Sequence, residues 1–351
     1  MEARGLIRSI TSVLWFGAVV LVGSILILGK DVLVPLVIAL IIWHLINALN
    51  EGIAAVPRVG PALPGWARLT LSFLVIGLLL TLFGRMASQN IAEVTEAAPR
   101  YKETLNAVMH DLSVWAGLGQ AIDLEHLMRQ VPIEDLVPDV ASAVSGLVGQ
   151  AGLILVYVLF LLIEQRRFDD KLRALFPDPG KEARARAILG RIERDIETYV
   201  WIKTATSIAT GAISYAVLIV VGVDYAAFWA VVIFLLNYIP TIGSLLGVAF
   251  PALLALVQFD TAVPAVVVAG TLGAVQITIG NLVEPRLMGR SLNLSPLTVI
   301  VSLVVWGNIW GVVGMFIGVP LTGILVIVMS YIPAARPVAI VLSSDGRIQD
   351  R

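Results

Sequence analysis

The feature that most constrains this chain is a series of apolar runs, most of them close to the ~20 residues that cross ~30 Å of hydrocarbon as a helix. The runs lie at residues 10–28, 32–49, 69–83, 144–163, 202–221, 226–257, 263–283 and 297–332. None of them alternates apolar and polar residues with a period of two, so a β-barrel is not indicated. We interpret the first run as a retained span, since no small-x-small cleavage site precedes Lys30. The pattern predicts an all-α polytopic membrane protein with about eight hydrophobic segments.

Composition agrees with this class and disfavours others. Of the 351 residues, 58% are hydrophobic and 14% are charged, against about 25% charged in an ordinary soluble domain. A soluble fold of this size has too little polar surface to cover so many apolar side chains. The net charge of −1 gives no basic surface for nucleic acid. With no cysteine and only His44, His110 and His126, we expect no metal and no other cofactor.

Charge divides the chain into regions on the two sides of the membrane. Residues 87–143 hold nine acids and three Lys or Arg, whereas residues 164–203 hold ten Lys or Arg and eight acids. Since basic residues favour the cytoplasmic side, both termini are predicted to be cytoplasmic. We expect N-terminal spans at 1–86, an extracytoplasmic helical segment at 87–143, a span at 144–163, a cytoplasmic helical segment at 164–200, a transport core at 201–332 and a cytoplasmic tail at 333–351.

Two of the apolar runs are too long for one crossing, and each is interrupted by helix-breaking or polar residues. The breaks read NYIPTIG at residues 237–243 and WGNIWG at residues 306–311. Irregular backbone at membrane depth must be buried in protein or line a cavity, so each run is predicted to form a hairpin. The candidates for a substrate path are Asn237, Pro240, Thr241, Gly243, Gln276, Asn281, Trp306, Asn308, Gly311 and Gly314. We expect the two tips to approach each other near the middle of the bilayer.

The two breaks resemble each other. Asn237-x5-Gly243-x3-Gly247 is matched by Asn308-x5-Gly314-x3-Gly318. Matching broken helices are typical of secondary transporters with inverted repeats, which bind their substrate at the repeat interface. The Gly-x3-Gly spacing is also a common helix-packing pattern in membranes. Both interpretations remain open at this point.

The chain lacks the motifs of ATP hydrolysis, metalloprotease and esterase chemistry, so no enzyme is predicted. Glu284 is the best titratable candidate for ion coupling, together with Arg286. The alternative is that these two residues form an interfacial ion pair that closes a helix end. Because Pro285 cannot donate a backbone hydrogen bond, we expect a helix to end near Glu284.

Three segments resemble one known family: LNYIPTIGS at 236–244, EPRLMGR at 284–290, and the stretch from Leu303 to Thr322. They are similar to signatures of the autoinducer-2 exporter family of bacterial membrane proteins, which includes PerM-like permeases. The likeness covers most of the chain and is best after about residue 195. It implies a homo-oligomer in the bacterial inner membrane that moves a small solute.

The leading functional hypothesis is a secondary transporter that exports a small polar organic solute such as autoinducer-2. The alternative is a sodium/proton antiporter, which other members of the family resemble. A second alternative is a non-transporting membrane scaffold. Polar breaks in hydrocarbon are costly, and a scaffold has no need of them, so the scaffold is disfavoured.

Overall fold

The computed structural model describes residues 17, 20–58, 60–79, 81, 82, 84, 85, 146, 149–259, 261–288 and 292–346. Within these residues the regular structure is helical, apart from an isolated β-bridge between Leu294 and Ser343. Four helices are long and apolar enough to cross a membrane: Lys30–Ala55, Pro179–Val221, Val263–Met288 and Pro296–Ser330. Shorter apolar helices are Gly65–Leu79, Ala151–Glu164, Ala226–Leu236 and Ile242–Gln258. The prediction of an all-α polytopic membrane protein is confirmed, while the expected segment 87–143 lies outside the described residues.

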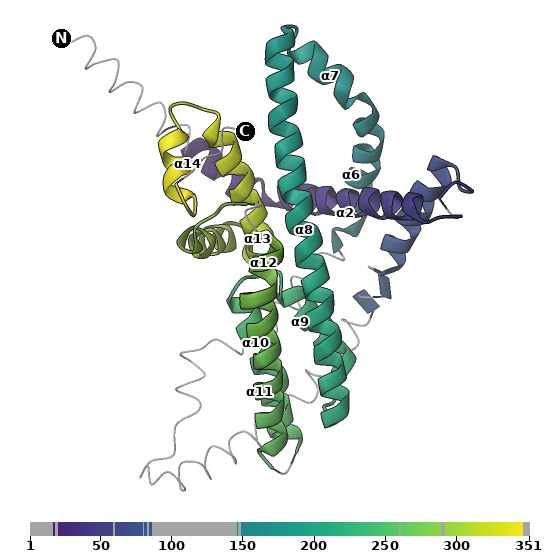
Figure 1. Cartoon of the computed structure of the whole chain (residues 1–351), viewed down its shortest axis with the longest axis vertical. Coiled ribbons are helices and arrows are strands. Elements are labelled where there is room, and N and C mark those ends of the chain that lie inside the picture. The colour runs from purple at the N-terminus through teal and green to yellow at the C-terminus, as the bar shows by residue number, and fades with distance from the viewer. Residues whose placement is uncertain are drawn as a thin grey trace, which may run out of the picture.

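Helix α8 (Pro179–Val221) is the longest of the described helices and runs along most of the height of the molecule (Figure 1). Its 43 residues span about 64 Å, roughly twice the hydrocarbon thickness. The Asp178 side chain caps it by accepting the Lys181 amide at 2.9 Å, and Gly222 ends it at φ 83°. Residues 179–201 are rich in charge, whereas Lys203 is the only charged residue from 202 to 221. Residues 200 and 201, the expected boundary between cytoplasmic segment and core, therefore lie within one continuous helix.

Helix α7 (Phe168–Leu175) lies beside the charged half of α8 (Figure 1). It follows α6 (Ala151–Glu164) and the short 3₁₀ turn η1 (Gln165–Arg167). Arg186 of α8 donates to Asp169 of α7 at 2.6 Å. This guanidinium lowers the pKa of the Asp169 carboxyl below its ordinary value. The pair is exposed, so it orients α7 and contributes little to stability.

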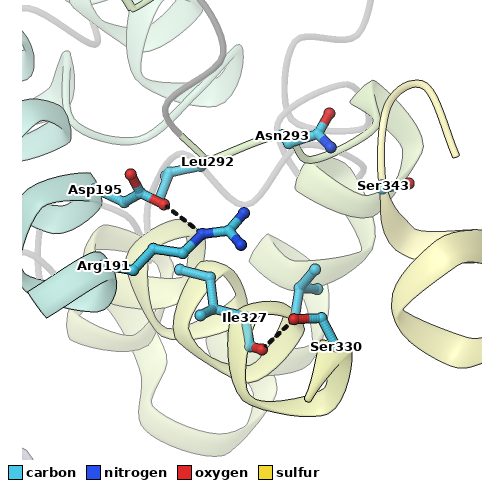
Figure 2. Close-up of a pocket in the computed structure, with 8 residues that line it drawn as sticks. Arg191, Asp195, Leu292, Asn293, Ile327, Ser330 and Ser343 are labelled. Carbon is cyan, nitrogen blue, oxygen red and sulfur yellow. Dashed lines mark hydrogen bonds and ion pairs between the residues drawn. The ribbon is translucent and has the colours of Figure 1, made fainter. Parts of the chain in front are cut away.

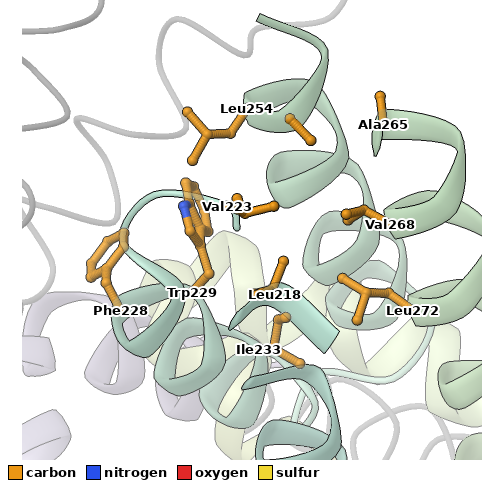
Figure 3. Packing of buried hydrophobic residues seen from close by; sticks show 10 residues of the cluster. Leu218, Val223, Phe228, Trp229, Ile233, Leu254, Ala265, Val268 and Leu272 are labelled. Atoms are coloured by element: carbon orange, nitrogen blue, oxygen red, sulfur yellow. The ribbon is translucent and has the colours of Figure 1, made fainter. Parts of the chain in front are cut away.

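The apolar half of α8 packs against the first predicted hairpin, which consists of α9 (Ala226–Leu236) and α10 (Ile242–Gln258). Together with α11 (Val263–Ile277), these helices enclose one apolar cluster (Figure 3). Its buried members are Leu218, Val223, Phe228, Trp229, Ile233, Leu254, Ala255, Ala265, Val268 and Leu272. Gly211 lets α9 approach closely, because a Cβ atom there would lie 3.0 Å from the Ala230 carbonyl oxygen.

The first tip (residues 237–243) confirms the predicted break. Thr241 adopts φ 64° and ψ −58°, and the Ile242 amide donates to the Pro240 carbonyl at 2.7 Å. These values describe a classical γ-turn, a conformation that is strained for a β-branched residue. The chain then folds back so tightly that a Cβ atom on Gly243 would lie 1.7 Å from the Leu236 carbonyl oxygen.

The second predicted hairpin is α13 (Pro296–Ser330), in which the helical conformation is interrupted at Gly311, with φ 64° and ψ −143°. Past this kink, a Cβ atom on Gly314 would lie 1.9 Å from the Trp306 carbonyl oxygen. The two limbs are joined by Trp306, whose Nε1 donates to the Thr322 hydroxyl at 3.0 Å. The predicted second break is thus confirmed as a tight reversal, which we call the second tip (residues 306–314). The short helix α14 (Arg336–Leu342) follows.

The expectation that a helix ends near Glu284 is wrong. After α11, the chain continues as a π-helix, η2 (Thr278–Val283), and then as α12 (Glu284–Met288). A π turn is wider than an α turn, so the backbone passes Pro285 without meeting the usual clash with the carbonyl one turn earlier. The apolar helix therefore continues to Met288.

The N-terminal part of the described chain packs against α6 and against the second hairpin. Helix α2 (Lys30–Ala55) contacts α6 through a cluster of Ala39, Ile46, Ile154 and Val158. It also packs against the second hairpin, where Trp310 Nε1 donates to the Leu26 carbonyl at 2.9 Å. This contact attaches the N-terminal spans to the kink of α13.

Candidate functional site

The two hairpins meet beside α8. The ring of Tyr238, in the first tip, stacks on Phe316 of the second hairpin with centroids 4.5 Å apart and planes inclined by 23°. Leu236 and Ile239 share a buried cluster with Leu303 and Val319, and Val312 packs against it. The first tip therefore contacts the second hairpin just past the second tip, while contact between the two tips themselves and their depth at mid-bilayer stay predictions.

A buried polar face of α8 runs past the first tip. Its members recur at spacings of three and four residues, so they lie on one side of the helix. They are Tyr199, Lys203, Thr206, Ser207, Thr210 and Ser214. Thr206 and Thr210 donate to carbonyls of their own helix at 2.9 and 2.8 Å, which satisfies their hydroxyls locally.

Two hydrogen bonds join α8 to the first tip. Asn237, which is 6% exposed, donates through Nδ2 to the Ser207 hydroxyl at 3.0 Å. The hydroxyls of Thr204 and Tyr238 lie 2.6 Å apart. The break in the first hairpin is therefore held by neutral donors and acceptors, as a polar site in an apolar medium requires.

The strongest polar contact joins α8 to α12. Lys203 Nζ donates to Glu284 Oε1 at 2.6 Å, with side chains that are 5% and 14% exposed. Arg286 is exposed, so the ion pair that the sequence predicted between Glu284 and Arg286 is replaced by one between Glu284 and Lys203. Lys203 was not among the sequence candidates, because it follows directly on the cytoplasmic basic cluster and was assigned to it. Its position as the only charge after residue 201 in α8 was the available signal.

Next to this pair lies an unpartnered hydroxyl. Tyr199 is 4% exposed, and its phenolic oxygen has no hydrogen-bond partner. It lies one helical turn before Lys203, within electrostatic range of both Glu284 and Tyr238. Buried hydroxyls are normally bonded, so the Tyr199 hydroxyl is an exception among the buried polar groups of α8.

The remaining sequence candidates divide into two groups. Gln276 is buried on α11 beside Gly247, where a Cβ atom would lie 3.3 Å from its Nε2. Asn281 and Asn308 are exposed, and Asn308 donates to the Val304 carbonyl of its own helix at 2.7 Å. Pro240, Thr241 and Gly243 shape the first tip, and Trp306, Gly311 and Gly314 shape the second. The structure does not bring Asn308 and Asn237 together.

A small cavity lies away from these residues, near the charged half of α8 (Figure 2). It is lined by Arg191, Asp195, Leu292, Asn293, Val326, Ile327, Ser330 and Ser343. Its volume of about 30 Å³ suits one water molecule, which is too little for an organic solute. Among the described residues, no cluster of three or more His, Asp or Glu side chains is arranged to hold a metal ion.

Comparison with known proteins gives consistent matches over nearly the whole chain. A sequence model described as AI-2E family transporter matches residues 10–334. The chain is 31% identical over 323 residues to the AI-2 transport protein TqsA of Escherichia coli, covering 90% of each protein. It is 30% identical to a putative transport protein of Haemophilus influenzae, covering 97% of each, and 29% identical to the putative transport protein YhhT of E. coli, covering 92% and 91%.

Proposed function

This chain belongs to the AI-2E family of transporters, and from that premise we propose that it exports a small polar organic solute of the autoinducer-2 class. It is a multi-pass protein of the bacterial inner membrane, like its transporter relatives. The observation that carries the proposal is the buried polar contact between α8 and the first tip. Neutral hydrogen-bonding groups there match a hydroxylated, uncharged solute better than a charged one.

The site has the parts that a solute pathway needs. Asn237 has two amide donors and one carbonyl acceptor, and its hydrogen bond to Ser207 uses one donor. The γ-turn at Thr241 leaves the first tip in irregular backbone, the arrangement by which broken helices bind substrates in secondary transporters. The substrate path then runs past Asn237 and Tyr238 on one side and the polar face of α8 on the other.

Sodium/proton antiport is the second candidate, and the Lys203–Glu284 pair favours it. An ionisable pair within membrane helices is costly and typically marks an ion or proton pathway. The two candidates are separated by purified protein in sealed liposomes, assayed for autoinducer-2 flux and for sodium-driven change of internal pH. Solute flux without pH change supports export, and pH change without solute flux supports antiport. If neither assay gives a signal, both candidate functions are contradicted.

We also propose that both termini and residues 164–200 are cytoplasmic, that residues 87–143 are extracytoplasmic, and that the chain forms a homo-oligomer. The basic residues support the orientation, and the family resemblance supports the assembly. Since the chain has no cysteine, single introduced cysteines report orientation cleanly. Ser113→Cys should react with an impermeant maleimide in intact cells, and Ala183→Cys on exposed α8 surface only after permeabilisation. The reverse pattern would invert the proposed topology.

A further inference from the structure

Lys203 and Glu284 form a buried charge pair between α8 and α12. Lys203 lies at the start of the apolar part of α8, where no other residue from 202 to 221 is charged. Glu284 begins α12, directly after the π-helix η2. Both side chains are largely buried, and their atoms approach to 2.6 Å. A buried carboxylate requires a positive partner, because the apolar surroundings do not solvate its charge.

The groups that face Glu284 come from two other elements. Lys203 and Tyr199 lie on α8, and Tyr238 lies in the first tip within electrostatic range of Tyr199. On its own helix, Arg286 is exposed and does not form the pair. The unpartnered phenolic oxygen of Tyr199 lies one helical turn before Lys203 on the same buried face of α8. A buried carboxylate is a suitable ligand for a small hard cation.

The backbone at Glu284 is also unusual, because this residue lies where a π-helix passes into α12. Pro285, directly after it, has no amide hydrogen to donate. Single π turns of this kind occur frequently at functional sites. Glu284 thus offers a buried carboxylate at such a turn, and Lys203 supplies the positive charge that is paired with it.

We propose that Lys203 is an internal counter-ion, and that Glu284 is the ligand of a monovalent cation that replaces the Lys203 ammonium in another state of the transport cycle. The Glu284 carboxylate is then paired with one cation at all times. This cation is the Lys203 ammonium in the state described, and a proton or a sodium ion when α8 and α12 separate. This inference rests on the proposed transport function for the replacement step. The affinity of the site for the cation does not depend on flux and is tested without it.

The test uses the purified full chain in detergent, with thermal unfolding as the readout. Lys203→Met removes the counter-ion and keeps the apolar stem of the side chain. Its Tm should rise by about 3 °C or more when choline chloride is replaced by sodium chloride at equal ionic strength, or when the pH falls from 8 to 5.5. Acidification stabilises this variant because protonation removes an unpaired buried charge. A sodium response identifies sodium as the ligand, and a response to acid alone identifies the proton.

Three controls assign the effect to the pair. Wild-type protein and Lys203→Arg should change by less than about 1 °C on the sodium-for-choline exchange, because the carboxylate already has its cation. The double variant Lys203→Met/Glu284→Gln should lose the cation and acid response of Lys203→Met. If Lys203→Met yields no folded protein, Lys203→Gln replaces it, and recovery of folded protein only in sodium or acidic buffer is the same supporting result.

The proposal is overturned if the single variants respond to neither cation, if they fold in no buffer, or if the double variant keeps the response. These outcomes are separate from the transport assay. A cation response in Lys203→Met protein together with silent liposomes would contradict the proposed function alone. Solute flux in liposomes with the wild-type protein, together with variants that do not respond to cations, would contradict only the counter-ion proposal.

Discussion

The two hairpins share a backbone design but differ in the side chains at their tips. In each, one glycine (Gly243 or Gly314) lies on a carbonyl of the first limb, and a second glycine four residues later lies against a side chain. Gly247 lies against Ile233 and Gln276, and Gly318 against Trp306. The matching glycines therefore make close packing contacts in both hairpins, as the Gly-x3-Gly interpretation expects. These contacts occur at two matching breaks, as the repeat interpretation expects.

The side chains at the two tips have different surroundings. Asn237 and Tyr238 of the first tip form hydrogen bonds to hydroxyl groups of α8. Trp306 and Trp310 of the second tip lie in an apolar cluster with α2, and Asn308 faces outward. The comparison teaches that matching backbone geometry does not carry matching chemistry. The first tip is the better candidate for solute contact, and the second is a structural support.

The largest expected effect tests whether the two hairpins share the same backbone geometry at their tips. Gly243→Ala and Gly314→Ala should each destabilise the protein by roughly 4 kcal/mol or more, because the added Cβ atom would overlap a backbone carbonyl. The measurement is the yield of monodisperse protein and its thermal unfolding. Gly273→Ala, where nothing lies within 4 Å of the new Cβ atom, is the matched control and should be nearly neutral. Unequal costs at the two tips would show that the hairpins are not equivalent in backbone geometry.

The second prediction tests whether the side chains at the two tips differ in their contribution to solute transport. Asn237→Ala should reduce solute flux about tenfold, since a hydrogen bond to the solute worth ~1.4 kcal/mol is lost, while Asn308→Ala should leave flux unchanged. Flux is measured in liposomes per folded molecule. Asn308→Ala is the control, because it removes the same side chain from the corresponding position of the other hairpin. Equal losses in the two variants would restore a symmetrical pathway.

The third prediction concerns the backbone at the turns, where two substitutions should have opposite effects on stability. Thr241→Gly should stabilise the protein by about 1 kcal/mol, because glycine adopts the γ-turn at φ 64° without strain. Gly311→Ala should destabilise it by about 2 kcal/mol, because φ 64° with ψ −143° is open almost only to glycine. Chemical or thermal unfolding of both variants checks the opposite signs. A loss of stability in Thr241→Gly would mean that the threonine side chain, rather than the turn, holds the first tip.

Much of the fold was predictable because hydropathy and chain breakers act locally. The apolar runs located the helices, and Pro240 and Gly311 marked breaks that the structure confirms. The partner of Glu284 was not predictable in this way, because Lys203 lies 81 residues away in the sequence. The outward direction of Asn308 depends on the rotation of its limb against α2, which sequence spacing does not fix. The π-helix before Pro285 was missed because helix propensity describes α turns only.

Helix α8 also has a mechanical consequence. Its backbone hydrogen bonds run without interruption from the charged surface beside α7 to the apolar cluster beside α11. A helix of this kind is stiff along its axis, so a rotation imposed on Arg186 or Arg191 turns Lys203 by the same angle. A protein that binds Arg186 or Arg191 would thus act on the ion pair from about three helical turns or more away. The length of α8 therefore couples the charged surface beside α7 mechanically to the buried ion pair.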